Sequence, residues 1–146
     1  MRKKGITMVE IVVVLAIISL LTAAVIPVYN KARKRSLVVR TQTIISSIEA
    51  ALSMYTTDFG DYPWYSGTET KFLVELLQGP VESNLWKGPY MRFKEKDLDQ
   101  QTNIVDAWST PIYYGYPQTE KSNVPYLLIS AGPDRKIWTS DDIGNW

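Results

Sequence analysis

The sequence predicts an α+β protein in which a long N-terminal helix, membrane-spanning in its first half, packs on a small antiparallel β-sheet. Three observations lead to this fold class. From Ile6 to Val28 every side chain except Glu10 is apolar or small and uncharged, and about 20 apolar residues let a helix cross a bilayer. An apolar stripe at helical spacing follows. Short apolar runs separated by Pro and Gly fill the remainder.

The composition limits the chemistry that this chain can perform. Its 146 residues have a net charge of +1 and contain no His and no Cys. Thiolate and imidazole metal sites, Cys nucleophiles, Ser-His-Asp triads and disulfides are therefore excluded. Carboxylate or lysine catalysis stays formally open, but we expect no enzyme. The near-neutral charge gives no indication of a nucleic-acid partner.

Residues 1–5, Met-Arg-Lys-Lys-Gly, form a short basic leader before the apolar run. The run is longer than the 7–15 apolar residues of a secretory signal, and no small-residue cleavage site closes it at the right distance. We therefore expect residues 6–28 to be retained as a membrane-spanning helix in contact with the lipid bilayer. Residues 29–146 would then form an extracytoplasmic domain that includes the amphipathic half of the long helix.

The order of residues around the end of the leader is distinctive. Lys3-Lys4-Gly5 is followed by Ile6-Thr7-Met8-Val9-Glu10 and then by the apolar segment. This arrangement resembles the N-terminus of type IV pilins and type II secretion pseudopilins. The resemblance implies that a prepilin peptidase cuts between Gly5 and Ile6 and that Ile6 is then N-methylated. Ile6 stands where that family most often has Phe.

Glu10 is the one ionisable side chain in the apolar segment. A charge in such a helix costs about 2.5–3.5 kcal/mol at mid-membrane and less near the interface, and an opposite charge offsets this cost. Removal of the leader creates a positive α-amine one helical turn away. We expect the amine of a neighbouring copy to pair with Glu10 and so to set the register of assembly. The alternative is a solvated Glu10 in the headgroup region with no role.

Pro27 lies near the end of the apolar segment. Proline removes a backbone donor and clashes with the preceding turn, and the lost hydrogen bond falls near Ala23. Ser19 and Thr22 could satisfy carbonyls locally. Pro27 therefore either kinks the helix or simply marks the end of the span, and the resemblance implies local melting of the helix on filament packing.

The helix continues well beyond the membrane. Its apolar stripe alternates spacings of three and four residues, and we expect it to pack on the sheet and to end near Thr57, before Gly60 and Pro63. The stripe consists of Val38, Thr41, Ile45, Ile48, Leu52 and Tyr55. The basic cluster at residues 31–35 is either a headgroup-facing collar or a set of pairing groups for a neighbouring copy.

The rest of the chain predicts one short helix and a few strands. The helix is expected over residues 69–77, with Thr68 as its N-cap and Gly79-Pro80 after it. Residues 112–116 and 124–130 predict two strands joined by a polar loop, and a third short strand is expected at Ile137-Trp138.

Five further segments extend the resemblance over nearly the whole chain and narrow it to the major pseudopilins of type II secretion. These segments are Asp58-x-Gly60-x-Tyr62-Pro63, Gly88-Pro89-Tyr90, Asp106-x-Trp108-x-x-Pro111, Ser130-Ala-Gly-Pro-Asp134 and the closing Asp141-Asp-Ile-Gly-Asn-Trp146.

The C-terminal loop gathers carboxylates among Gly and Ser. Hard oxygen ligands of this kind suit Ca²⁺, although the spacing is not that of an EF-hand. The resemblance implies a calcium site made by the side chains of Asp134, Asp141 and Asp142 with backbone carbonyls near Ser130 and Ile137. The alternative is three acidic turn residues that cap strands.

We therefore expect a structural subunit of a helical periplasmic pseudopilus that drives protein secretion across the outer membrane. By resemblance, it would sit in the inner membrane with its N-terminus cytoplasmic, and would assemble with copies of itself, minor pseudopilins and an inner-membrane assembly platform. Two alternatives stay open. One is the major subunit of a surface type IV pilus. The other is a membrane-anchored binding module, in which Tyr62, Trp64 and Tyr65 line a sugar or peptide site rather than covering the sheet edge or filling the core.

Overall fold

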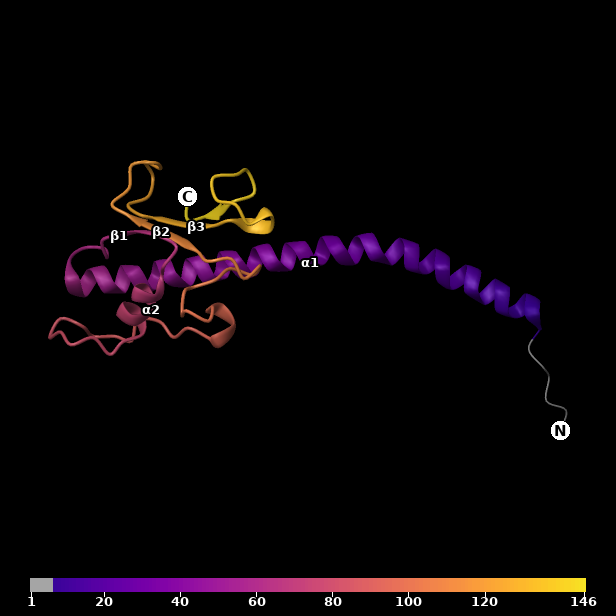
Figure 1. Cartoon of the computed structure of the whole chain (residues 1–146), viewed down its shortest axis with the longest axis horizontal. Helices are drawn as coiled ribbons and strands as arrows, with labels where there is room; N and C mark the ends of the chain where they lie inside the picture. Colours follow the sequence, from indigo (N-terminus) through magenta and orange to yellow (C-terminus); the bar gives the residue numbers. More distant parts are fainter. Residues whose placement is uncertain (1–6) are drawn as a thin grey trace, which may run out of the picture. The chain divides into compact units, whose positions relative to one another are not determined.

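The computed structural model describes residues 7–146. They form two compact units, one ending at Ser36 and the other comprising Leu37–Trp146. Figure 1 shows the elements in chain order. These are α1 (Met8–Phe59), β1 (Tyr65–Gly67), α2 (Lys71–Gln78), the 3₁₀ helix η1 (Glu95–Asp97), β2 (Tyr113–Tyr116), β3 (Leu127–Ser130), the 3₁₀ helix η2 (Gly132–Asp134) and β4 (Ile143–Gly144).

The predicted long helix is confirmed in both units. In the second unit one face of α1 is buried, because its apolar side chains recur at helical spacing. The buried residues are Thr41, Ile44, Ile45, Ile48, Ala51 and Leu52. The helix ends as predicted before Gly60, whose N–H donates to the carbonyl of Thr56 at 2.8 Å. Gly60 has φ +86°, a left-handed conformation that glycine adopts without a Cβ penalty.

The sheet is antiparallel throughout, with four strands in the order β1-β2-β3-β4. Tyr65 pairs with Tyr116, and Tyr114 pairs with Leu128. The two predicted strands are confirmed as β2 and β3, although both are shorter than expected. Strand β1 was not predicted, because the three residues of this edge strand lie close after Pro63 and lack an apolar alternation.

The predicted third strand is in the wrong place. Ile143 of β4 pairs with Ser130 of β3, whereas Ile137 and Trp138 lie in the loop before it. Trp138 has φ +72°, which is incompatible with an extended strand. Its N–H donates to Asp142 Oδ2 at 2.7 Å instead of to a neighbouring strand.

The short helix α2 begins two residues later than predicted. Its N-cap is Thr70, not Thr68. The Thr70 hydroxyl makes no cap, because Oγ1 accepts a hydrogen bond from the N–H of Ile104 at 2.8 Å. Apolar side chains at Leu73, Val74 and Leu77 are buried and fix the helix against the core.

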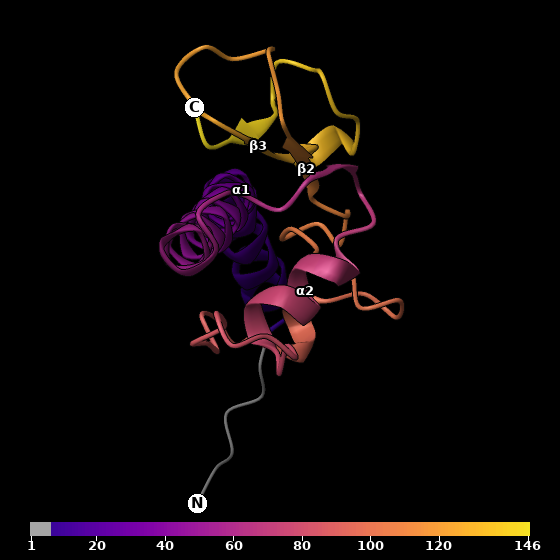
Figure 2. The ribbon, with the colours of Figure 1, turned by 90° about the vertical axis from the view of Figure 1, so that its left-hand side faces the viewer.

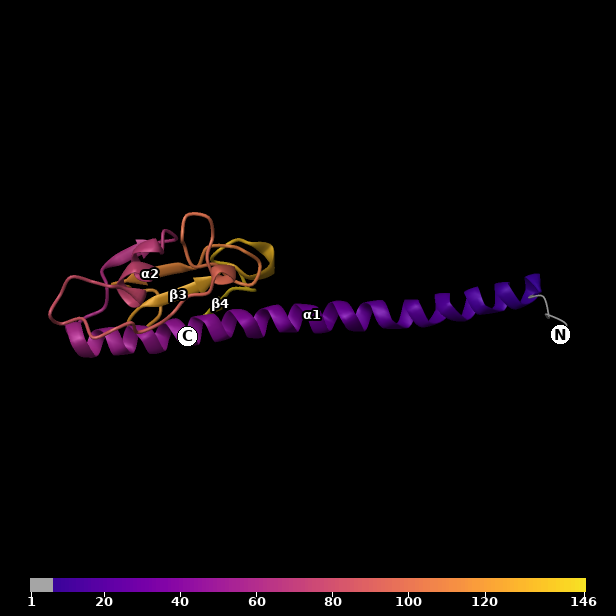
Figure 3. The same ribbon diagram turned by 90° about the horizontal axis from the view of Figure 1, so that it is seen from below.

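The core of the second unit is shared by three elements. Residues of α1, α2 and the sheet meet in one buried cluster. The view along the long axis shows the sheet on one side of α1 and α2 on another (Figure 2). Seen from below, α2 and β3 lie on the same side of this part of α1 (Figure 3). Tyr114 is fully buried in the cluster. Its hydroxyl donates to the carbonyl of Pro63 at 2.8 Å, so its polar atom is satisfied.

The loop after α2 is tied to the C-terminal end of α1 by Asp58. Tyr90 Oη donates to Asp58 Oδ2 at 2.7 Å, and Lys87 Nζ lies 3.2 Å from Asp58 Oδ1. The Tyr90 hydrogen bond, followed by the hydrogen bonds and charge of Lys87, holds the pKa of Asp58 below its usual value. Hydrogen bonds to the charged form favour that form.

Candidate functional site

Thr7 and Glu10 cap the N-terminus of α1 reciprocally. Glu10 N–H donates to Thr7 Oγ1 at 3.2 Å, and Thr7 N–H donates to Glu10 Oε2 at 3.4 Å. This is a capping box, in which each side chain satisfies a backbone amide that the first helical turn leaves unpaired. The carboxylate of Glu10 is therefore held at the start of the helix.

The capping bond leaves Glu10 able to bind a second donor. An ionised carboxylate offers about four acceptor positions on its two oxygens, and the bond from Thr7 uses one of them. The aligned peptide dipoles of a helix also favour negative charge at its N-terminus. Glu10 can thus cap its own helix and still accept from a neighbouring ammonium group.

Gly5 and Ile6 lie outside the described residues. Cleavage after Gly5 and methylation of Ile6 therefore stay predictions. Thr7, which follows Ile6 directly, is the first described residue.

The first unit presents an apolar surface. Every described residue up to Ser36 is exposed, and Leu15, Ile18 and Leu21 are each more than half exposed. Among the described residues, α1 is the one helix that is long and apolar enough to cross a membrane, with a mean hydropathy of 2.9 over its most apolar window. An exposed apolar surface of this size requires lipid or a protein partner to cover it.

Pro27 lies inside α1 and does not end the helix. Ser19 Oγ donates to the carbonyl of Leu15 at 2.8 Å, and Thr22 Oγ1 donates to the carbonyl of Ile18 at 2.7 Å. Proline at position 27 removes the donor for the carbonyl four residues earlier, at Ala23. The two hydroxyls bond elsewhere, so they do not provide the predicted local compensation.

The carboxylates of the C-terminal loop bind mainly to the loop itself. Asp142 Oδ2 accepts from the N–H groups of Trp138 and Thr139, at 2.7 and 3.0 Å. Asp141 Oδ2 accepts from the N–H of Asp134 at 3.3 Å, while Asp134 Oδ1 accepts from the N–H of Lys136 at 2.8 Å. These bonds close the loop on itself and stabilise its turns.

Three acceptor oxygens of this loop lie around the hydroxyl of Thr139. Its Oγ1 lies 2.8 Å from Asp141 Oδ1, 3.1 Å from the carbonyl of Lys136 and 3.4 Å from Asp142 Oδ1. A hydroxyl has one proton to donate, so three acceptors surround a single donor. The structure thus brings Asp141 and Asp142 together, and Asp134 contacts Asp141 through its backbone amide.

Carbonyl ligands were predicted near Ser130 and Ile137. Ser130 ends β3, whereas Ile137 lies seven residues later in the C-terminal loop. Ser130 is fully buried at the end of β3, and its hydroxyl donates to Asp106 Oδ2 at 2.6 Å. Its Oγ accepts from the N–H of Gly132 at 3.2 Å. Ile137 is half-buried in the segment between η2 and β4. Ser130 therefore anchors the start of the loop through its side chain.

The oxygen donors of the loop fit a hard cation in their chemistry. Among residues 7–146 no three carboxylates converge closely enough to hold a metal ion by themselves. Two carboxylates and one backbone carbonyl do meet at Thr139. Calcium accepts such mixtures of carboxylates, carbonyls and water, so Asp141, Asp142 and loop carbonyls are the residues that would hold it.

Two family models match the chain. The prokaryotic N-terminal methylation motif matches residues 1–26. The model of type II secretion system protein G matches residues 28–146. The chain belongs to the type II secretion system protein G family. The resemblance to secretion pseudopilins is therefore confirmed.

Individual members of the protein G family match over almost their whole length. The type II secretion system core protein G of Pseudomonas aeruginosa is 34% identical over 149 residues, which cover 99% of this chain and 96% of the relative. The core protein G of Escherichia coli is 30% identical and covers 99% of this chain and 92% of the relative.

A solved structure shows the same fold. The crystal structure of the major pseudopilin from the type 2 secretion system of enterohaemorrhagic Escherichia coli aligns with a TM-score of 0.50 at 22% identity. The alignment covers 80% of this chain and 91% of that chain. The predicted fold, a long helix on a small antiparallel sheet, is confirmed.

Three residues that shape these sites in this protein G family member, Thr7, Thr139 and Gly132, were not predicted from the sequence. The Thr7-x-x-Glu10 spacing is a readable capping-box signature, so Thr7 could have been found. Thr139 and Gly132 carry no such signal. A Cβ at Gly132 would lie 2.4 Å from the carbonyl oxygen of Asp141, an approach that only the folded loop reveals.

Proposed function

We propose that this protein G family member is the main structural subunit of a helical periplasmic pseudopilus that drives protein secretion across the outer membrane, without a catalytic role of its own. The observation that carries the proposal is the placement of Glu10. Its carboxylate is fixed at the start of the helix and can accept a further hydrogen bond. The exposed apolar surface of α1 follows directly after it. The family match over residues 28–146 supports the secretion role.

The pairing of Glu10 with another copy supplies the assembly signal. Cleavage after Gly5 would give Ile6 a positive α-amine, which can approach the Glu10 carboxylate of a docked copy. In lipid, an unpaired charge is costly and a neutralised pair is much less so. A subunit that docks out of register would leave Glu10 unpaired, so the pair selects one register.

The proposed location and partners follow from the same segment. The apolar part of α1 would hold the subunit in the inner membrane, with the C-terminal unit in the periplasm, until assembly covers the apolar surface with other copies. A prepilin peptidase would remove residues 1–5. Minor pseudopilins and an inner-membrane assembly platform would complete the machinery.

Calcium is proposed as the ion of the C-terminal loop. Asp141, Asp142 and the carbonyl of Lys136 are the oxygens that the loop brings together. A bound cation would offset the repulsion between the two neighbouring carboxylates. It would also close the end of a chain that has no disulfide.

Glu10→Gln tests the assembly proposal without disturbing the helix start. Glutamine also serves at this position of a capping box, so the variant removes the charge and keeps the cap. We expect normal membrane insertion and processing, but no filaments and no secretion. Glu82→Gln, at an exposed position, is the matched control and should assemble normally. Filaments recovered from Glu10→Gln cells would overturn the proposal.

A further inference from the structure

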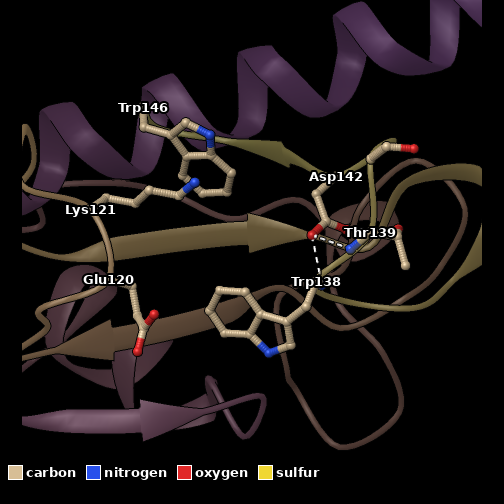
Figure 4. A pocket seen from close by; sticks show the side chains of 7 residues that line it. Glu120, Lys121, Trp138, Thr139, Asp142 and Trp146 are labelled. Carbon is tan, nitrogen blue, oxygen red and sulfur yellow. Dashed lines mark hydrogen bonds between the residues drawn. The ribbon is translucent and has the colours of Figure 1, made fainter.

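A polar cavity lies in the second unit between the loop before β3 and the C-terminal loop. Its volume is about 360 Å³. Figure 4 shows the rings of Trp138 and Trp146 on opposite sides of the space, with Glu120 and Lys121 at one end and Thr139 and Asp142 at the other. From these groups we infer that the cavity binds a neutral, unbranched oligosaccharide. This inference does not depend on the filament role.

Both indoles are substantially exposed. Trp138 is 55% exposed and Trp146 is 42% exposed. Single exposed aromatic residues are common in proteins, but here two of them face one cavity. An indole offers a flat apolar face and one N–H donor, a combination that suits the C–H face and the hydroxyl edge of a pyranose ring.

The local backbone fixes Trp138 and leaves room for the ring of Trp146. Trp138 adopts φ +72°, which is unfavourable for a bulky residue and indicates a position that its surroundings enforce. Asp142 fixes it by accepting from the N–H groups of Trp138 and Thr139. The ring of Trp146 occupies the space where a Cβ of residue 144 would lie, 1.9 Å from its Cζ3. Only glycine at position 144 admits this ring.

The rest of the lining is polar, which favours a sugar over an apolar ligand. Apart from the two indoles, every lining side chain is charged or carries a hydroxyl. Glu120 supplies acceptors, and Lys121 supplies donors with its Nζ 4.7 Å from the centre of the Trp146 ring. Sugar hydroxyls donate and accept at once, so they can match both kinds of group. Glu120 and Lys121 balance each other's charge, so the cavity does not favour a charged ligand.

An adjoining cavity indicates a ligand longer than one ring. It has a volume of about 250 Å³ and shares Glu120 and Trp138 with the first. Tyr113 and Ser66 line it, and the Tyr113 ring stands edge-on to Trp138 with their centres 5.9 Å apart. Trp138 therefore lies between two binding spaces. This arrangement fits successive units of a linear sugar chain.

The test uses the full chain in dodecylphosphocholine micelles, because glycoside detergents would compete for the cavity. The probes are cellotetraose, maltotetraose and tetra-N-acetylchitotetraose, measured by saturation-transfer NMR and titration calorimetry. We expect at least one probe to bind. Trp138→Ala and Trp146→Ala should each weaken its binding by about tenfold or more, as is typical of buried aromatic contacts.

Two further variants separate binding from folding. Trp64→Ala removes another exposed indole, 73% accessible and outside both cavities, and should leave binding unchanged. Glu120→Gln changes an exposed side chain and should weaken binding several-fold while the melting temperature stays constant.

Three results would overturn the inference. One is the absence of binding by all three probes, and another is binding that survives loss of both indoles. The third is full protection of Trp138 from oxidation in assembled filaments, which would assign the cavity to a contact between proteins.

Discussion

The hydroxyl of Ser130 donates a 2.6 Å hydrogen bond to Asp106 Oδ2, and both side chains are buried. Asp106 Oδ1 accepts from the N–H groups of Trp108 and Thr110, both at 2.9 Å. Ser130 Oγ in turn accepts from the N–H of Gly132. The turn after Val105 and the start of the C-terminal loop are therefore joined through one buried carboxylate.

Ser130→Ala should destabilise the second unit. It leaves the amide of Gly132 and one oxygen of Asp106 without their partner, and a buried unsatisfied polar group costs about 1–3 kcal/mol. We expect the melting temperature of the full chain in detergent, followed by near-ultraviolet circular dichroism, to fall by several degrees. Ser46→Ala, at an exposed position on α1, is the control. Equal melting of both variants would contradict this role of Ser130.

A calcium chelator should lower the melting temperature of the full chain. An ion that binds only the folded state at a hundred times its dissociation constant stabilises by about 2.7 kcal/mol. Asp141→Ala should melt at the lower temperature with or without chelator, because it removes one of the two carboxylates at Thr139. Identical melting of the wild type in chelator and in calcium would exclude the proposed ion.

Asp58 should make stability sensitive to acid. Its pKa in the folded chain is lowered, mainly by the hydrogen bond from Tyr90, so its contribution is complete above the pKa of the unfolded chain. That contribution disappears as the pH falls through the folded value. The free energy of unfolding, measured with a chemical denaturant, should be lower for Asp58→Asn than for the wild type at pH 6. This gap should close below about pH 4. A gap that stays constant down to pH 2.5 would contradict this assignment.

Thr7→Ala should separate capping from charge pairing. The variant loses the hydroxyl that caps the amide of Glu10, which costs about 1 kcal/mol of helix stability, but it keeps the carboxylate. We expect filaments in reduced yield, where Glu10→Gln gives none, and Thr7→Ser should restore the yield. Loss of all filaments in Thr7→Ala, with the chain still processed, would show that the cap itself is essential.

The sequence predicts the features that depend on local patterning. The stripe from Thr41 to Leu52 places α1 on the core, because the 3.6-residue period leaves one face apolar. Glycine at position 60 marks the helix end for a conformational reason. The strands β2 and β3 were found because a polar loop separates two runs of β-branched and aromatic residues.

The features missed from sequence depend on contacts between distant residues. The hydroxyl of Thr70, the N-cap residue of α2, makes no capping bond because it accepts from the N–H of Ile104, 34 residues away. Arg40 lies outside the apolar stripe of α1, and its guanidinium forms a 2.8 Å ion pair with Asp97, 57 residues away. The strand β4 begins at Ile143 rather than at Ile137 because Asp142 holds the intervening loop through the amides of Trp138 and Thr139.

The most direct test of the account is a zero-length carbodiimide cross-link between Ile6 and Glu10 in purified filaments. Trypsin should release residues 6–31 as one peptide, because no Lys or Arg lies between Lys4 and Lys31. A link between copies joins two such peptides, whereas a link within one chain leaves a single peptide. The pair Lys87–Asp58, 3.2 Å apart, is the internal control. We predict the joined pair of 6–31 peptides by mass spectrometry. Filaments that yield the Lys87–Asp58 link but no joined pair would contradict the proposed contact.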